Sequence, residues 1–247
     1  MNKWLAQAGV CSRREAEALI ADGLVSIDGE VVADVGRKIL PGQTLTLNQG
    51  GEAALESRMT VIIHKPVGVV SAQPEGDQIP AIRLVRPANQ WGQGGAVPSA
   101  RQVLAPVGRL DMDSRGLLLL SDDGVLAKAV IGPASLLDKE YFVEVRGEVT
   151  PEKIRLLRHG LELDDRQLKP AKVTEVSPGR LRFVLTEGRN RQIRRMCELV
   201  ELEVVDLLRT RIGPLSLGDL PEARWRLLTA QERNALVAAS SAAPSES

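Results

Sequence analysis

Apolar and polar positions in the first 48 residues indicate a small domain in which helices precede strands. Residues 2–9 predict a short helix that ends at Gly9. Ser12 and Glu15 have the spacing of an N-terminal capping box, and an apolar stripe at helical spacing follows them. We therefore expect two short helices at the start of the chain.

Strand patterns complete this domain, which we place at residues 1–48. Short β-branched runs flank Asp28-Gly29, a pair typical of hairpin turns, and residues 44–47 alternate as in a further strand. Residues 49–58 contain Gly and Glu and have no clear periodicity. We interpret residues 49–58 as an interdomain linker.

From Met59 onward the pattern predicts a larger α+β domain, which we place at residues 59–235. Its expected elements are buried strands within 61–71 and at 117–120, helices from about 121 and 150, a strand from 138, strands on both sides of Pro178-Gly179, and a helix whose buried stripe is Ile193, Met196, Cys197 and Val200. The Ala- and Ser-rich segment 236–247 is expected to be a disordered tail.

Composition excludes several classes of protein. The formal net charge is zero, so a nucleic-acid partner must be argued from local clusters of charge. Two cysteines and two histidines without metal-ligand spacing argue against a zinc site, and no apolar run approaches the length of a membrane span. We expect a soluble cytoplasmic protein that needs neither a metal nor a membrane.

The most informative stretch is Gly108-Arg109-Leu110-Asp111-Met112-Asp113-Ser114-Arg115-Gly116, which precedes the buried run 117–120. It places Asp111 in a glycine-bounded loop held by a strand, where proteins often present reactive groups. The residues alone leave two interpretations open, because an Asp in a turn commonly caps backbone amides.

Four motifs resemble those of the ribosomal RNA pseudouridine synthases. They are Gly108-Arg109-Leu110-Asp111, Lys65-Pro66-Val67-Gly68, Lys139-Glu140-Tyr141 and Arg191-Gln192-Ile193-Arg194-Arg195. The branch they resemble comprises A-type enzymes, which act on the small ribosomal subunit, and B-, E- and F-type enzymes, which act on the large one. Residues 1–48 resemble the αL-type S4 RNA-binding domain. The resemblance implies a mixed, mainly antiparallel sheet flanked by helices, with the site in a cleft across it.

The resemblance also implies roles for individual residues. Asp111 corresponds to the essential carboxylate, Tyr141 to a side chain against the target base, and Arg194 to a guanidinium against the catalytic Asp. Expected RNA contacts are Lys3, Arg13, Arg14, Arg109, Arg189, Arg191, Arg195, Arg209 and Arg211, although exposed arginines are more often only solvated. His64 is interpreted as a hydrogen-bonded structural residue.

Residues 72–103, rich in Pro, Gly, Gln and Ser, form a long segment on which the resemblance is weakest. Long loops in compact domains are usually functional or disordered. We favour a mobile surface loop, and the alternative is an RNA-contacting flap with Trp91 as a stacking platform.

The implied function is isomerisation of a specific uridine to pseudouridine in ribosomal RNA, by a monomer without a cofactor. Asn190-Arg191 favours the F type, and hence 23S rRNA of the large ribosomal subunit. A 16S rRNA or tRNA anticodon-loop target and a non-catalytic S4 RNA-binding protein remain alternatives. The sequence leaves open whether Asp111 attacks the sugar, attacks the base or assists a glycal route.

Overall fold

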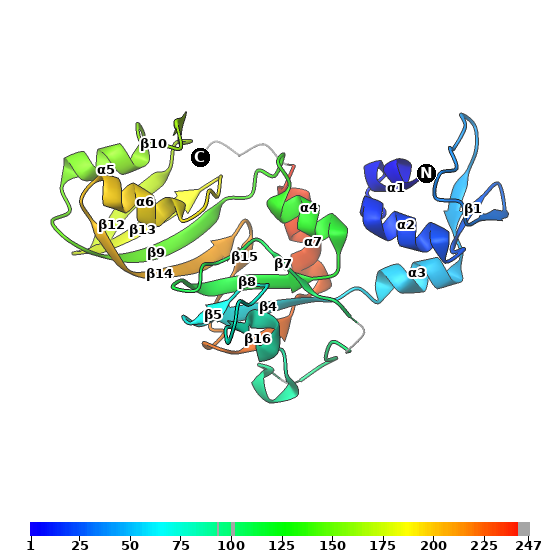
Figure 1. Ribbon diagram of the computed structural model, residues 1–247, viewed down its shortest axis with the longest axis horizontal. Coiled ribbons are helices and arrows are strands. Elements are labelled where there is room, and N and C mark those ends of the chain that lie inside the picture. Colours follow the sequence, from blue (N-terminus) through cyan, green and yellow to red (C-terminus); the bar gives the residue numbers. More distant parts are fainter. Residues whose placement is uncertain (93, 100–101, 242–247) are drawn as a thin grey trace.

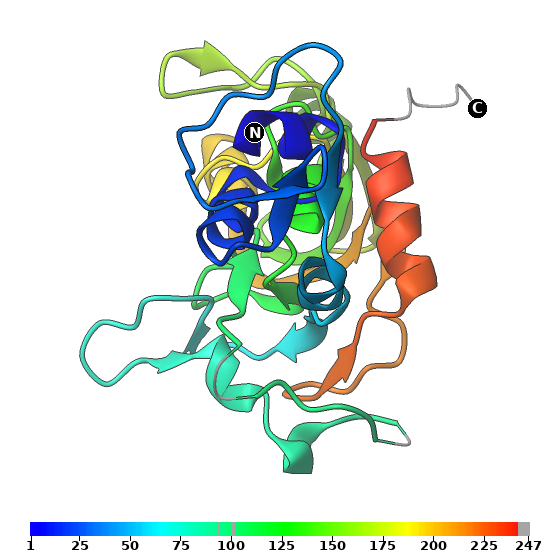
Figure 2. The same cartoon turned by 90° about the vertical axis from the view of Figure 1, so that its right-hand side faces the viewer.

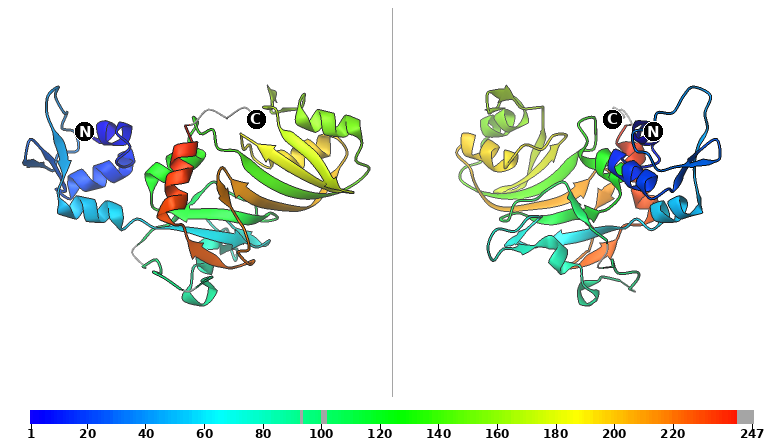
Figure 3. Two further views of the ribbon diagram at one scale, coloured as in Figure 1. Left: turned by 180° about the vertical axis from the view of Figure 1, so that it is seen from behind. Right: turned by 45° about the vertical axis from the view of Figure 1, so that its right-hand side comes forward.

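A computed structural model describes residues 1–92, 94–99 and 102–241. The N-terminal domain contains α1 (Asn2–Gln7), α2 (Arg13–Ala21), β1 (Val25–Ile27), β2 (Glu30–Val32), β3 (Leu45–Leu47) and α3 (Gln49–Glu56). Its strands form an antiparallel sheet in the order β2-β1-β3. Helices α1 and α2 lie on the side that faces the rest of the molecule, and the sheet lies on the far side (Figures 1 and 3).

Local sequence signals account for these elements. The amide of Glu15 donates to the Ser12 hydroxyl at 3.3 Å, and the amide of Ser12 donates to the Glu15 carboxylate at 2.6 Å, so the capping box is present. Asp28 and Gly29 both have positive φ, as a tight hairpin turn requires. The two predicted helices and the hairpin are therefore found where the sequence placed them.

The segment predicted as a linker is instead the helix α3, which packs on the N-terminal domain. Asn48 caps it by accepting a 2.9 Å hydrogen bond from the amide of Gly51, and the Asn48 amide donates to the Leu24 carbonyl. A Cβ on Gly51 would lie 2.9 Å from that carbonyl oxygen. Gly51 is thus required for close packing of α3 against Leu24. In the sequence, a glycine at this position could not be told apart from a glycine of a linker.

The large domain begins at β4 and contains most of the secondary structure. Its strands are β4 (Thr60–Lys65), β5 (Val69–Val70), β6 (Ile79–Pro80), β7 (Ala105–Val107), β8 (Arg115–Ser121), β9 (Lys139–Arg146), β10 (Glu162–Leu163), β11 (Arg166–Gln167), β12 (Lys172–Ser177), β13 (Arg180–Leu185), β14 (Glu203–Ile212), β15 (Leu215–Ser216) and β16 (Trp225–Leu227). Its helices are η1 (Ala81–Leu84), η2 (Pro87–Asn89), α4 (Gly124–Ile131), α5 (Pro151–Arg158), α6 (Gln192–Leu199) and α7 (Ala230–Ala239).

A mixed, mainly antiparallel sheet runs through this domain in the order β12-β13-β9-β14-β8-β4-β16. Within this order the β14–β8 pair is parallel and the other neighbours are antiparallel. The α+β fold class predicted from the sequence is confirmed. Figure 2 shows α7 along one side of the large domain.

Strand β8 lies at the centre of the packing and is buried on both faces. Leu117 and Leu119 belong to the core that contains α4 and α7, whereas Leu118 and Leu120 belong to a core on the other face with Trp225. Successive side chains of a strand point to opposite faces, so burial of both faces produces a continuous apolar run. A third core lies between α5, α6 and strands β9, β12, β13 and β14.

The predicted end of the large domain at residue 235 differs from the structure. Helix α7 continues to Ala239, and Leu236 is fully buried, so the large domain extends past residue 235. Residues 242–247 of the predicted tail lie outside the described residues, as do residues 93, 100 and 101 of the 72–103 loop. The described part of that loop contains β6, η1 and η2, and the Trp91 amide donates to the Trp225 carbonyl at 2.7 Å.

Candidate active site

Asp111 lies in the loop between β7 and β8, and backbone hydrogen bonds hold that loop. The Ser71 hydroxyl accepts from the Leu110 amide at 2.9 Å and donates to the Leu110 carbonyl at 2.6 Å. The Ser114 amide donates to the Asp111 carbonyl at 3.1 Å. The loop backbone is thus fixed, while the Asp111 side chain remains 36% exposed.

Gly116 lets the end of this loop approach β14. Its φ is +112°, and a Cβ there would overlap the backbone of Arg209. Arg209 is 4% exposed, and its guanidinium donates to the carbonyls of Leu117 at 2.8 Å and Arg109 at 3.4 Å. Arg209 was expected to contact RNA, but its burial and these bonds place it as a support for the Asp111 loop.

Lys65 supports the same loop through the turn that follows β4. Its side chain is fully buried at the end of β4, and Nζ donates to the carbonyls of Pro66 at 2.8 Å and Val69 at 2.6 Å. Burial lowers the pKa of Lys65 from 10.5 to about 8, although the charges of Asp113 and Asp111 act to raise it. The Gly68 amide donates to the Met112 carbonyl at 2.8 Å, so the Lys65–Gly68 motif is joined directly to the Asp111 loop.

This depressed pKa predicts how stability varies with pH. Between pH 8 and 10.5 the unfolded chain binds a proton at Lys65 that the folded chain does not, so this residue raises the free energy of unfolding as pH rises. The difference between 10.5 and about 8 corresponds to roughly 3 kcal/mol. We therefore expect Lys65→Met to cost more stability at pH 10 than at pH 7.5, measured by denaturant unfolding.

The comparison with wild type cancels the other groups that titrate in this range. Loss of the Nζ group leaves the carbonyls of Pro66 and Val69 without their donor, which adds about 1–3 kcal/mol that does not depend on pH. A deficit of equal size at the two pH values would show that Lys65 keeps an ordinary pKa in the folded protein.

Arg191 and Arg194 hold the acidic side of the loop. Arg191 forms a fork with Asp113, with Nη1–Oδ1 at 3.1 Å and Nη2–Oδ2 at 2.8 Å, and its Nη1 lies 3.6 Å from Oδ2 of Asp111. Nε of Arg194 lies 3.3 Å from Oδ2 of Asp113, and Nη2 donates to the Asp113 carbonyl at 2.7 Å. The Arg191 hydrogen bond holds the pKa of Asp113 below its usual value, against the effect of burial and with help from the Arg194 charge.

The guanidinium beside Asp111 therefore differs from the one expected. Within the described part of the chain, Arg191 is the residue whose ion pair reaches Asp111, whereas Arg194 binds Asp113. Arg191 precedes α6 with a left-handed backbone, φ +48°, which carries its side chain over the loop. The sequence assigned Arg191 to RNA contact and could not show this backbone turn.

These residues line a pocket of about 590 Å³, a size common for small-molecule sites. Its walls include Asp111, Tyr141 on β9, and Arg191 and Arg194 from α6 and the turn before it. Tyr141 is partly buried between two of the hydrophobic cores. The three residues expected to be catalytic, Asp111, Tyr141 and Arg194, thus meet at one pocket.

The other expected RNA contacts divide into three groups. Arg109 and Arg189 line the pocket, and Arg189 also donates to the carbonyls of Leu163 and Gln167. Arg195 and Arg211 are paired through two bonds each with Asp164 and Asp138, at 2.7–2.9 Å. The side chains of Lys3, Arg13 and Arg14 are exposed on the N-terminal domain.

Sequence reasoning missed several residues that shape the site. Ser71 clamps Leu110, Asp113 pairs with both arginines, and Lys139 lines the pocket with a pKa lowered by burial and by the Arg209 charge. Asp113 and Lys139 stand inside motifs that were recognised, so motif membership was the available signal. Ser71 carried no such signal, because its role depends on contact with a residue 39 positions away.

The described residues contain no cluster of three or more His, Cys, Asp or Glu side chains placed to hold a metal ion. Of the described helices, none is both long enough and apolar enough to cross a membrane. Nδ1 of His64 lies 2.8 Å from the Leu220 carbonyl oxygen, which accepts a hydrogen bond from it, as the structural interpretation of this histidine requires.

A carboxylate, a tyrosine and several arginines thus line one pocket of the large domain, and a small domain of helices and a three-stranded sheet precedes it. The family profile described as RNA pseudouridylate synthase matches residues 59–199, and the S4 domain profile matches residues 2–45. The chain therefore belongs to the RNA pseudouridylate synthase family, whose members are isomerases, and carries an S4 domain.

Similar proteins agree with this family. The chain is 34% identical to the dual-specificity RNA pseudouridine synthase RluF of Salmonella typhi, over 94% of this chain and 76% of the relative. It is 33% identical to the ribosomal large subunit pseudouridine synthase B of Bacillus subtilis, over 94% of this chain and 93% of the relative. A crystal structure of a pseudouridylate synthase aligns with a TM-score of 0.65 at 25% identity, covering 95% of this chain and 98% of the other.

Proposed function

We propose that this protein converts a specific uridine of large-subunit, 23S ribosomal RNA to pseudouridine, with Asp111 as the essential carboxylate. The observation that carries the proposal is the partly exposed Asp111 carboxylate, in a loop held by hydrogen bonds, at an arginine-lined pocket. The large-subunit target is supported by the names of two relatives, from Bacillus subtilis and Pseudomonas aeruginosa, as ribosomal large subunit pseudouridine synthases.

The reaction requires one bond exchange at the ribose. The bond from C1′ to N1 of uracil breaks, the base turns, and C1′ bonds to C5. C5 then loses its proton, and N1 gains one. No electron leaves the substrate, so we propose that no cofactor takes part. A stacked or paired uridine must flip out to reach a pocket, at a cost of a few kcal/mol.

The proposed roles of the pocket residues follow from this chemistry. Asp111 acts on the flipped nucleotide, and Tyr141 lies against the base, with removal of the C5 proton as its candidate task. Arg191 compensates the charge of Asp111, while Arg194 holds Asp113 and thereby the loop. Arg109 at the pocket wall binds a backbone phosphate, which positions an RNA without reading its sequence. Arg189, which the sequence also assigned to RNA contact, instead donates to backbone carbonyls beside the pocket.

The N-terminal domain is proposed to bind the same RNA outside the pocket, through Lys3, Arg13 and Arg14. The exposed positions of these cations support the assignment, because phosphate contacts need accessible charge. We further propose that the protein acts as a monomer in the cytoplasm.

Mapping pseudouridines in ribosomal RNA tests the proposal. RNA from cells with and without the gene would be treated with a carbodiimide and read by primer extension. We expect one stop in large-subunit RNA to disappear with the gene and to return on complementation with the wild-type gene but not with an Asp111→Asn gene. A stop lost from small-subunit RNA or tRNA would refute the large-subunit target, and no change in any of these RNAs would favour a binding protein without this activity.

A further inference from the structure

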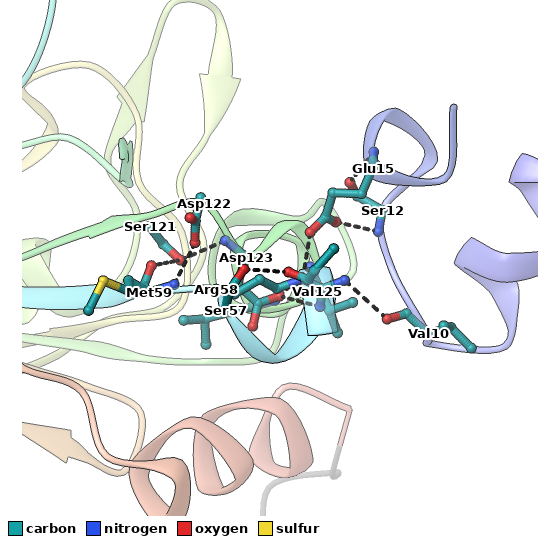
Figure 4. Close-up of polar contacts among 12 residues, drawn as sticks. Val10, Ser12, Glu15, Ser57, Arg58, Met59, Ser121, Asp122, Asp123 and Val125 are labelled. Atoms are coloured by element: carbon teal, nitrogen blue, oxygen red, sulfur yellow. Dashed lines mark hydrogen bonds and ion pairs between the residues drawn. The ribbon is translucent and has the colours of Figure 1, made fainter. Parts of the chain in front are cut away.

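Arg58 contacts both domains. Arg58 stands between α3 and β4, and its side chain is 12% exposed. Its Nε lies 2.9 Å from Oε1 of Glu15 on α2, and its Nη2 donates to the Val10 carbonyl at 3.3 Å. Its Nη1 lies 3.5 Å from Oδ1 of Asp123 in the large domain (Figure 4).

Both acids that meet Arg58 are already fixed within their own domains. Glu15 accepts from the Ser12 amide in the capping box of α2. Asp123 is 2% exposed, caps α4 through the amides of Val125 and Leu126, and accepts from Arg233 of α7 at 2.6 Å. Because neither carboxylate must be ordered to meet Arg58, the contact costs little side-chain entropy.

The surfaces around Arg58 are in direct contact. Gly124 is the first residue of α4, and a Cβ there would overlap Ser12 and Glu15 of the N-terminal domain. The N-termini of α2 and α4 therefore meet, although their partial positive charges repel. The carboxylates of Glu15 and Asp123 offset this repulsion.

The chain next to Arg58 is anchored to the same place. Met59 and Asp122 exchange two hydrogen bonds, from the Met59 amide to Oδ1 at 2.7 Å and from the Asp122 amide to the Met59 carbonyl at 3.3 Å. Arg58 thus leaves a backbone that is fixed to the start of α4. The N-terminal domain is held by α3, Arg58 and the α2–α4 contact, where the sequence indicated only an interdomain linker at residues 49–58.

Helix α4 connects this junction to the pocket. It has eight residues, so it spans about 12 Å. Its first residue meets the N-terminal domain, and its last residues, Val130 and Ile131, line the pocket together with Gly132. The orientation of the N-terminal domain is therefore set relative to a wall of the pocket.

We propose that Arg58 is a positioning residue that holds the S4 domain in one orientation on the catalytic domain, so that an RNA bound by both is presented to the pocket at a fixed distance. This goes beyond the proposed function and depends on it only in naming RNA as the shared ligand. A fixed geometry selects an RNA by the spacing of two contact regions, whereas a loose tether only raises its local concentration.

A distance measurement between the domains tests the orientation. Val31 on β2 and Val176 on β12 are exposed, at 64% and 50%, and the native Cys11 and Cys197 are buried. Spin labels on Val31→Cys and Val176→Cys would report the distribution of distances by double electron–electron resonance. We expect one narrow distribution for the protein with Arg58, and a distribution at least about twice as wide with Arg58→Ala.

Two further variants separate this role from a general loss of stability. Gly124→Ala keeps every charge and places a residue with good helix propensity on α4, but its Cβ separates the domains, so it should also broaden or shift the distribution. Arg146→Ala removes an exposed ion pair of the same 2.9 Å length, with Glu203, within the large domain and should change nothing. Arg58→Lys keeps the positive charge but not the several nitrogens of the guanidinium. The width of its distance distribution should lie between those of the wild-type protein and Arg58→Ala.

Kinetics then test the consequence for RNA. For a large-subunit RNA fragment that extends to both domains, Arg58→Ala should raise KM about tenfold and leave kcat unchanged. For a stem-loop with the same uridine that is too short to reach α1 and α2, neither constant should change. If Arg58 only stabilised the fold, Arg58→Ala would lower the rates with the long RNA and with the short stem-loop by the same factor.

The outcomes are distinct. A broad distribution in the wild-type protein, or one that neither Arg58→Ala nor Gly124→Ala alters, overturns the proposal. An altered distribution with an unchanged KM for the long RNA also overturns it, because orientation would then not serve RNA binding. If the wild-type protein modifies no RNA, the proposed function fails, while affinity for the long and short RNAs replaces KM in the same comparison.

Discussion

Asp111→Asn is expected to abolish pseudouridine formation while leaving the fold and RNA binding intact. The amide has nearly the same shape as the carboxylate, but it cannot ionise or attack as an anion. The Asp111 side chain is 36% exposed, and its ion pair with Arg191 is long, at 3.6 Å, so its loss costs little stability. We expect turnover to fall by about a thousandfold or more.

The measurement is single-turnover release of tritium from RNA labelled at C5 of uridine, together with the affinity for the same RNA. Asp113→Asn is the matched control in the same loop. Because Asp113 binds both Arg191 and Arg194, its loss should destabilise the protein more than Asp111→Asn does. Wild-type turnover by Asp111→Asn would refute the role assigned to Asp111.

Arg191→Ala is expected to lower turnover by about ten- to a hundredfold. It removes the guanidinium beside Asp111 and the fork to Asp113, leaving two carboxylates of one loop with less compensation. The pKa of Asp113 should then rise towards its ordinary value, because the Arg191 hydrogen bond is the largest cause that lowers it. Since neither Arg nor Ala is glycine, the positive φ at this position imposes a similar strain in both proteins.

Arg195→Ala provides the comparison for this prediction. Arg195 lies on α6, the helix that Arg191 precedes, and its guanidinium binds Asp164 outside the pocket. Its removal should change turnover by no more than about twofold, as for other exposed ion pairs. Equal losses of turnover for the two variants would show that the arginines act together as an RNA-backbone surface, and that Arg191 has no special relation to Asp111.

Protonation of Asp113 gives Arg191→Ala a further signature in acid unfolding. A carboxyl group with a lowered pKa in the folded state contributes stability that is present above its ordinary pKa of 3.8 and is lost as pH falls through the folded value. Acid unfolding of Arg191→Ala should therefore begin at a higher pH than that of the wild-type protein. The same contribution is absent from Asp113→Asn at every pH.

Motifs and periodicity predicted the elements whose structure depends on residues close together in the sequence. The Ser12–Glu15 capping box and the Asp28-Gly29 turn depend on backbone groups within a few residues, so short stretches of sequence encode them. The run 117–120 is apolar at every position because β8 is buried on both faces. The glycines of the 49–58 segment misled the prediction because their packing partner, Leu24, is distant in sequence.

The sequence by itself indicated the family, the α+β class and three residues that meet at the pocket, Asp111, Tyr141 and Arg194, since each depends on local pattern or on a motif. The tertiary structure alone decided which arginine faces Asp111, that Lys65 lies under the loop, and that Arg58 joins the domains. These are contacts of side chains at the ends of distant elements. They depend on strand pairing and on single backbone angles, such as φ +48° at Arg191, which no periodicity records.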